Sequence, residues 1–157
     1  MTPDEGLRLL GQYSAGIDAE LSLLRQLSDI AKRQREATDA GNLAALGDAA
    51  DSRDEIMRSL VTIEEGLRVV RQTLTDHREV ASKLEGFEEV AARHREAAHL
   101  VTLILTTDRQ SLSALADAEL ARRSTVIGLE RGETTLAAYR RVLAPPIASA
   151  ALLDRRG

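Results

Sequence analysis

The feature that most constrains this chain is a long interval without proline, from Pro3 to Pro145, with apolar residues at helical spacing. From about Phe87 to Val142 the apolar positions alternate in steps of four and three, which is the heptad seam of a helix packed against other helices. A helix of about 55 residues would rise roughly 80 Å, so we expect it to extend past its partners or to contact another molecule. The expected seam is Val80, Leu84, Phe87, Ala91, His94, Ala98, Val101, Leu105, Asp108, Leu112 and Leu115.

Local signals mark the start of a first helix and a turn after it. Thr2 and Glu5 have the spacing of a capping box, and Pro3 stands at the first helical position. Gly41 suits the left-handed position that ends a helix, and Asn42 can cap the next one. So short a connection predicts an antiparallel helical hairpin, with continuation through a kink at Gly41 as the alternative.

The second helix has a less regular apolar row and a less distinct end. The steps from Met57 to Leu60 to Ile63 are three and three, which predicts a local change of winding. Gly66 lies inside the apolar row, so we interpret it as a tolerated helix glycine. Mild break signals place the next turn between about residues 75 and 86, with a helical piece inside it as an option.

These signals predict an all-α fold. We expect an elongated antiparallel bundle of about three long helices with coiled-coil packing, of which the third is the longest. Residues 1–143 would form the bundle, with helices at about 3–40, 43–75 and 87–143. Two prolines end the third helix, and residues 144–157 would form a flexible tail or a short docking helix.

Composition excludes several functions. Aromatic residues are only 2% of the chain, which suits thin helix–helix seams, and the absence of cysteine removes disulfides, thiolate metal sites and cysteine nucleophiles. The acidic N-terminus lacks signal-peptide order and no apolar run could span a membrane, so we expect a cytoplasmic protein without membrane insertion. The mildly basic C-terminal third is too weakly charged to indicate nucleic-acid binding.

Few polar residues have the spacing of a reactive site. Glu96 and His99 form one Glu-x-x-His step, whereas di-iron bundles use two, and both residues lie off the seam. We interpret them as solvated. His94 and Asp108 lie on the seam, where polar residues paired across helices fix register. We therefore predict no enzyme activity, no cofactor and no metal.

The C-terminal end of the third helix is the candidate interaction surface. Its apolar stripe would exceed the first two helices by roughly 30 Å, and an unpartnered apolar stripe marks a binding surface for another protein. Homodimer packing, or coverage by the tail after Pro146, are the alternatives. The predicted client-binding residues are Val126, Leu129, Leu136, Tyr139, Val142 and Leu143.

Two segments of the chain resemble flagellar type III export chaperones of the FlgN/FliT kind. The first segment is Leu27 to Leu60, and the second is Leu105 to Tyr139. The matching residues in the first are Gln34, Ala37, Gly41, Asn42, Leu43, Leu46, Arg53 and Leu60. In the second they are Asp108, Leu112, Leu129, Gly132, Leu136, Ala138 and Tyr139. An Asn-rich stretch common in such chaperones is absent, since Ala92-Arg93-His94-Arg95-Glu96 stands there.

The resemblance implies a cytoplasmic, non-enzymatic bundle. It would bind the C-terminal helical segment of a hook–filament junction or cap subunit, prevent its premature assembly and deliver it to the export apparatus. The competing classes are a structural coiled-coil adaptor or homodimerisation protein without an export role, and a ligand- or metal-holding bundle. If the seam is core, truncating Leu105 or Leu112 to alanine should cost about 2–5 kcal/mol, and truncating Leu129 or Leu136 far less.

Overall fold

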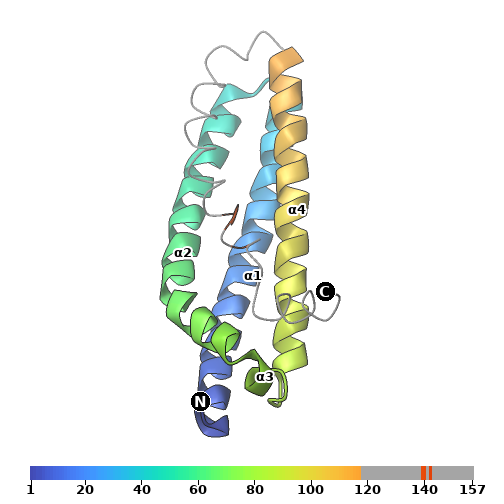
Figure 1. The fold of residues 1–157 in the computed structure, drawn as a ribbon. Helices are drawn as coiled ribbons and strands as arrows, with labels where there is room; N and C mark the ends of the chain where they lie inside the picture. The colour runs from blue at the N-terminus through green and yellow to red at the C-terminus, as the bar shows by residue number, and fades with distance from the viewer. Residues whose placement is uncertain (118–138, 141, 143–157) are drawn as a thin grey trace.

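The computed structural model describes residues 1–117, 139, 140 and 142, and its described elements are helices (Figure 1). Three are long: α1 (Pro3–Ala40), α2 (Leu43–Asp76) and α4 (Phe87–Asp117). A single helical turn, α3 (Arg78–Ala81), lies between α2 and α4. The expected all-α bundle is therefore confirmed, with one short helix in addition to the long ones among the described residues.

The predicted hairpin between α1 and α2 is confirmed in detail. The Thr2 hydroxyl accepts a hydrogen bond from the backbone N–H of Glu5 at 3.2 Å, and the Glu5 carboxylate accepts one from the backbone N–H of Thr2 at 2.9 Å. Gly41 has φ 64°, the left-handed conformation that ends α1, and the Asn42 side chain accepts from the backbone N–H of Ala45. The chain reverses here because both helix ends are capped within two residues.

The connection between α2 and α4 also lies where the sequence places it. α2 ends at Asp76, and α3 is the helical piece inside the turn. Gly86 has φ 85°, a conformation that side chains with a Cβ rarely adopt, and Phe87 begins α4 directly after it. The Glu85-Gly86 signal therefore marks the true start of the helix.

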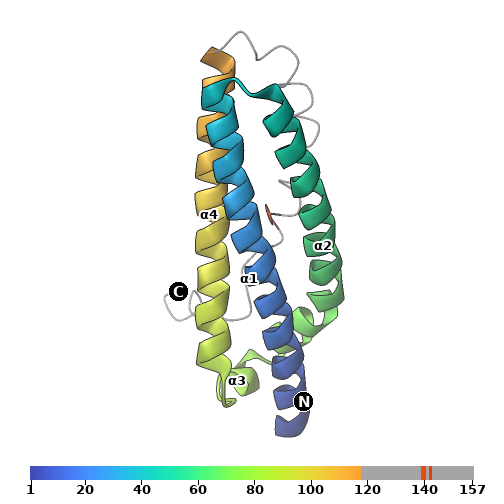
Figure 2. The same ribbon diagram turned by 180° about the vertical axis from the view of Figure 1, so that it is seen from behind.

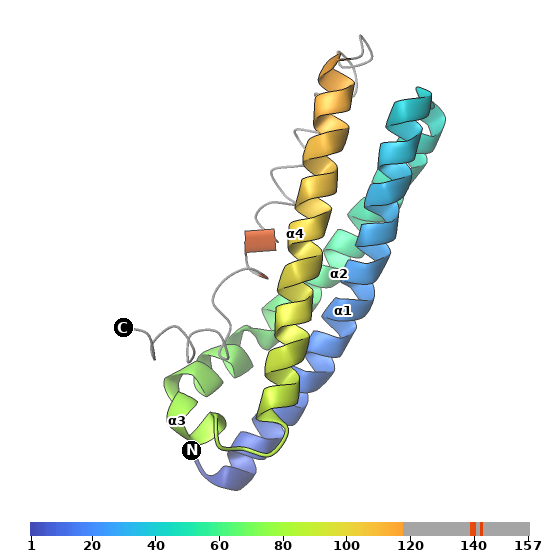
Figure 3. The same ribbon diagram turned by 90° about the vertical axis from the view of Figure 1, so that its right-hand side faces the viewer.

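α1 is the central helix of the bundle. α2 and α4 each pack along α1 but scarcely against one another. Figure 1 shows α2 and α4 on either side of α1, and the view from behind in Figure 2 shows α1 in front of the space between them. The side view in Figure 3 shows α3 at the end of the bundle that also holds the N-terminus. The wide apolar stripe of α1 is explained by these two neighbours.

The core divides into two clusters along the bundle axis. One, near the end with α3, includes Leu10, Leu74 and Phe87. The other, in the middle of the bundle, includes Leu24, Leu60 and Ile104, all at most 1% exposed. Small and branched aliphatic side chains dominate both clusters, as expected from the low aromatic content.

The predicted seam of α4 is half right. Phe87, Ala91, His94, Val101 and Leu115 are buried as expected, but Val90, Ala97, Ile104 and Ser111 are buried as well. Leu105 is only partly buried, and Leu112, expected to be core, is 44% exposed. One row of the seam was placed correctly, and the other lies one residue earlier than expected, at Ala97, Ile104 and Ser111. Leu112 was favoured over Ser111 because leucine is the more apolar residue.

The change of winding expected in α2 is not needed. Glu64, rather than Ile63, takes the buried position between Leu60 and Leu67, which restores the alternation of three and four. Gly66 lies inside α2, as expected. The error arose because only apolar residues were considered for the seam, and a buried glutamate was not.

Gly16 allows α1 to pack closely against α2. A Cβ added at Gly16 would lie 2.4–2.8 Å from three atoms of the Leu67 side chain, whereas one added at Gly11 meets nothing within 4 Å. Both glycines lie inside α1, so alanine gains the same helix propensity at each. We expect Gly16→Ala to be less stable than Gly11→Ala by about 1–3 kcal/mol in urea unfolding, because Leu67 is buried and cannot move freely. Equal stabilities would show that the packing at Gly16 is loose.

Within the described residues, each helix is too short or too polar to cross a membrane.

Candidate functional site

The polar residue Arg53 joins the elements of the bundle near its α1–α2 turn. Its guanidinium donates two hydrogen bonds to the Asp108 carboxylate on α4, at 2.8 and 2.5 Å. It also donates to the Gln34 side chain of α1 and to the Tyr139 hydroxyl, each at 2.8 Å. The side chains of Arg53 and Asp108 are only 12% and 23% exposed. The expectation that Asp108 is satisfied across the seam is therefore confirmed.

Contacts of Tyr139 exclude the expected unbroken third helix. One helix from Asp108 to Tyr139 would separate their backbones by roughly 46 Å. Both side chains instead contact the Arg53 guanidinium, so the chain cannot continue straight through Tyr139. The expected greater length of the third helix depends on residues 118–138, which lie outside the described part.

Tyr139 and Val142 are core residues. Each is 1% exposed, and both belong to the same cluster as residues of α1, α2 and α4. In Figure 1 the short red fragment near residue 140 is seen between the ribbons of α2 and α4, and Figure 3 shows it on the side of these two helices away from α1. The expectation that these two residues lie on an unpartnered stripe is wrong, because the bundle itself covers them. Val126, Leu129, Leu136 and Leu143 lie outside the described residues.

A second group of polar residues lies inside the other half of the bundle. It comprises Tyr13 and Glu20 from α1, Glu64 and Arg71 from α2, and His94 from α4. Arg71 donates to both oxygens of Glu64, at 2.7 and 3.0 Å, and its guanidinium lies 5.7 Å from the centre of the Tyr13 ring. We call these five residues the buried polar cluster.

His94 is satisfied across the seam, as expected. Its Nδ1 lies 3.2 Å from the Tyr13 hydroxyl, and the residue is 3% exposed. Burial, together with the positive charge of Arg71, lowers the pKa of His94 to about 4. The imidazole is therefore neutral at pH 7, and the Tyr13 hydroxyl can donate to it.

Glu20 is the least satisfied member of the buried polar cluster. It is 1% exposed, its nearest contact to Arg71 is 3.9 Å, and neither of its oxygens accepts a hydrogen bond from a described residue. Burial, followed by the effect of the neighbouring Glu64 carboxylate, raises the pKa of Glu20 well above its usual range. Burial alone would raise the pKa of Glu64 also, but the two hydrogen bonds from Arg71, with its positive charge, lower it.

The Glu-x-x-His step lies on the surface, as expected. His99 is exposed, and Glu96 accepts a hydrogen bond from Arg25 at 2.8 Å. Among the described residues, no three histidine, aspartate or glutamate side chains come together as metal ligands would. The polar groups of the interior are paired chiefly with one another, which is the arrangement that fixes helix register.

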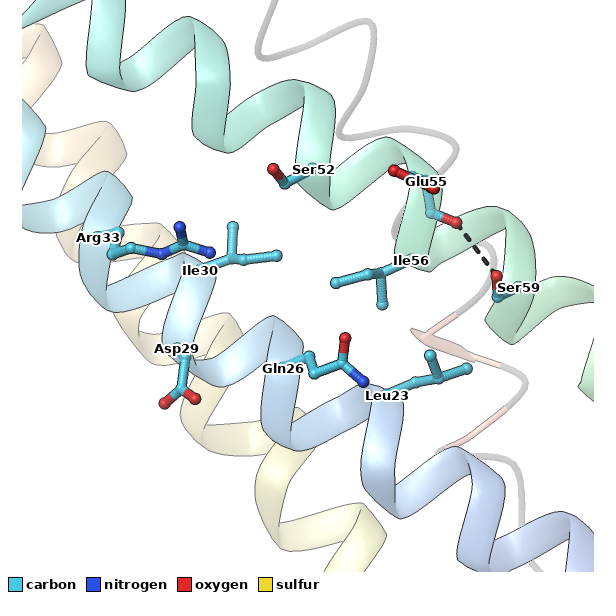
Figure 4. Close-up of a pocket in the computed structure, with 9 residues that line it drawn as sticks. All are labelled: Leu23, Gln26, Asp29, Ile30, Arg33, Ser52, Glu55, Ile56 and Ser59. Carbon is cyan, nitrogen blue, oxygen red and sulfur yellow. Dashed lines mark hydrogen bonds between the residues drawn. The ribbon is translucent and has the colours of Figure 1, made fainter.

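The surface between α1 and α2 carries a shallow groove of about 470 Å³ (Figure 4). Leu23, Ile30 and Ile56 supply its apolar part. The polar residues that line it are Gln26, Asp29, Arg33, Ser52, Glu55 and Ser59. In Figure 4 the one dashed contact is the bond from the Ser59 hydroxyl to the Glu55 carbonyl oxygen, within α2 itself. An apolar floor with a polar rim suits contact with another protein chain better than chemistry.

The sequence contained a signal for these residues that apolar periodicity did not use. Tyr13, Glu20 and Gln34 are separated by multiples of seven, as are Met57, Glu64 and Arg71, and as are His94 and Asp108. Searching for polar residues in heptad register would have found Glu20, Glu64 and Arg71 together with His94. Glu64 and Arg71 pair within α2, and the antiparallel packing of α1 against α2 brings Glu20 beside them.

Comparisons with protein-family models, curated proteins and solved structures found no match.

Proposed function

We propose that this chain is a cytoplasmic, non-enzymatic helical bundle that binds an amphipathic helix of another protein. The observation that carries the proposal is the separation of α2 from α4 along α1, with the apolar side chains of Tyr139 and Val142 buried between them. The bundle thus accepts apolar side chains from a distant part of the sequence, and an amphipathic helix of another protein would bind it in the helix-in-groove mode.

The partner we propose is a secreted flagellar subunit, specifically the C-terminal helical segment of a hook–filament junction or cap protein. The support is the resemblance to flagellar export chaperones, whose least generic match in the first helical hairpin is the Gly41-Asn42-Leu43 turn. The physical logic is that such a segment cannot bury its apolar face before assembly, and a bundle can cover it reversibly. Delivery to the export apparatus is part of the same proposal.

The proposed client contacts are Val126, Leu129, Leu136 and Leu143. Tyr139 and Val142 have a different role in the free chain, where they anchor their segment to the core. Arg53 strengthens that anchor through the Tyr139 hydroxyl.

A pull-down with matched subunit fragments tests this function. Purified chain should retain the C-terminal helical segment of the junction or cap subunit from the same organism, and should not retain an internal fragment of that subunit of equal length. Retention of both fragments alike, or of neither, would contradict the chaperone proposal. A structural coiled-coil adaptor would show no preference for the C-terminal segment.

A further inference from the structure

The buried polar cluster has one cation for two carboxylates. Glu20 and Glu64 lie on α1 and α2 at the interior of the bundle, and Arg71 is the positively charged side chain that faces both. Tyr13, also on α1, and His94 on α4 face the same cluster, and Arg95, next along α4, also acts on His94. If both carboxylates were ionised and His94 neutral, the interior would hold an uncompensated negative charge, which is strongly unfavourable at such burial.

The geometry shows which group can hold a neutralising proton. Glu64 is already bound by both nitrogens of the Arg71 fork, the arrangement of an ionised carboxylate. Neither oxygen of Glu20 has a hydrogen-bond partner among the described residues, and the Arg71 nitrogen nearest to it is 3.9 Å away, so an ionised Glu20 would be unsatisfied. A protonated Glu20 removes this unpaired charge and carries an O–H that can donate to the Glu64 carboxylate, which the same Arg71 binds. His94 is the competing site, but a protonated imidazole would place a second cation near Arg71.

We propose that the folded bundle binds one proton between Glu20 and Glu64, and that loss of this proton loosens the packing of α1 against α2. The proton is carried by Glu20 and shared with Glu64 through a hydrogen bond. Its release leaves two carboxylates facing one guanidinium in the interior. The bundle therefore contains a proton-binding site that makes its stability decline toward alkaline pH.

The direction of the pH dependence follows from proton counting. Above the ordinary carboxyl pKa of 4.5, the folded state holds a proton at Glu20 that the unfolded chain has lost, so stability falls as pH rises. His94 acts oppositely, because its pKa is lowered from 6.5 to about 4 and its contribution to stability is lost as pH falls through that range. Between about pH 4.5 and 6.5 the contributions of Glu20 and His94 to the pH dependence of stability cancel. Above about pH 6.5 only that of Glu20 remains, so the free energy of unfolding declines.

Urea unfolding of the full chain between pH 4.5 and 8.5 tests this site. The unfolding equilibrium constant of the wild type should rise by up to tenfold per pH unit above about 6.5. Glu20→Gln should abolish that rise, since glutamine imitates the protonated carboxyl. His94→Gln should extend the rise to lower pH. The control Glu36→Gln, an exposed position on α1, should behave like the wild type.

Two results would overturn the proposal. One is a Glu20→Gln variant that keeps the alkaline rise of the wild type. The other is a His94→Gln variant that loses the rise, which would place the proton on His94. If the variants do not fold, infrared spectroscopy of the wild type at pH 7 decides. The folded chain should show the carbonyl band of a protonated carboxylic acid, and absence of that band would exclude the shared proton.

Discussion

Replacing Arg53 with methionine is expected to lower the free energy of unfolding by about 3–5 kcal/mol. Methionine keeps much of the apolar stem of arginine but removes the guanidinium. The half-buried Asp108 carboxylate, the Gln34 side chain and the Tyr139 hydroxyl would then lose a common donor. Leaving a charge without its partner inside a protein costs more than the pair itself contributes, which is why the effect should be large.

The control for Arg53 is Arg25, which also forms an ion pair with a residue of α4. The side chains of Arg25 and its partner Glu96 are 58% and 48% exposed. Solvent screens such a pair, so Arg25→Met should cost no more than about 1 kcal/mol. Denaturant unfolding of the two variants under one condition makes the comparison. Equal decreases in the free energy of unfolding of the two variants would mean that the Arg53 network stabilises the fold no more than an exposed ion pair does.

A second variant separates the loss of the pair from the loss of packing. Arg53→Met combined with Asp108→Leu removes both charges together and should recover most of the stability lost by Arg53→Met alone. The recovery should be incomplete, because Gln34 and Tyr139 still lack the guanidinium. If the double variant is no more stable than the single one, burial of an unpaired Asp108 is not the reason for the loss.

Truncating Ile104 to alanine is expected to cost about 2–5 kcal/mol, whereas Leu112→Ala should remain within about 0.5 kcal/mol of the wild type. Ile104 is 1% exposed and packs in the central cluster with residues of α1 and α2, so its truncation leaves a cavity. Leu112 is 44% exposed and leaves none. The neighbour Leu103, which is 45% exposed, provides a second control on the same turn as Ile104.

Thermal and denaturant unfolding of these three variants decide which face of α4 is core. A large loss in Leu112→Ala with little loss in Ile104→Ala would restore the seam expected from apolar periodicity alone. Such a result would require α4 to be rotated about its axis relative to α1. Leu105 is partly buried and should give an intermediate loss.

The helix ends could be predicted because their signals are local. Gly41 and Asn42 act on their own turn, and the Thr2–Glu5 box needs only four residues to form. Which side chains face a partner helix depends on contacts far apart in the sequence, and here apolar periodicity alone gave wrong buried positions. It favoured Leu112 over Ser111 and Ile63 over Glu64, although burial selected the less apolar residue each time.

The candidate site was less predictable than the fold. His94 and Asp108 were recognisable as seam residues, but their partners lie 81 and 55 residues away in the chain. No spacing rule identifies Tyr13 or Arg53 as those partners without the hairpin geometry. The burial of Tyr139 and Val142 was missed because a long proline-free pattern was taken as one helix, and such a pattern is equally compatible with a chain that reverses.

The most direct test of the proposed function is a calorimetric titration of the client's C-terminal segment into the wild type and Leu129→Ala, with unfolding measured on both proteins. We predict that the wild type binds the segment and that Leu129→Ala binds it at least tenfold more weakly, while its free energy of unfolding changes by no more than about 0.5 kcal/mol. Undiminished binding by Leu129→Ala, or a loss of about 2–5 kcal/mol in its unfolding free energy, would contradict the account by making Leu129 either irrelevant or internal core.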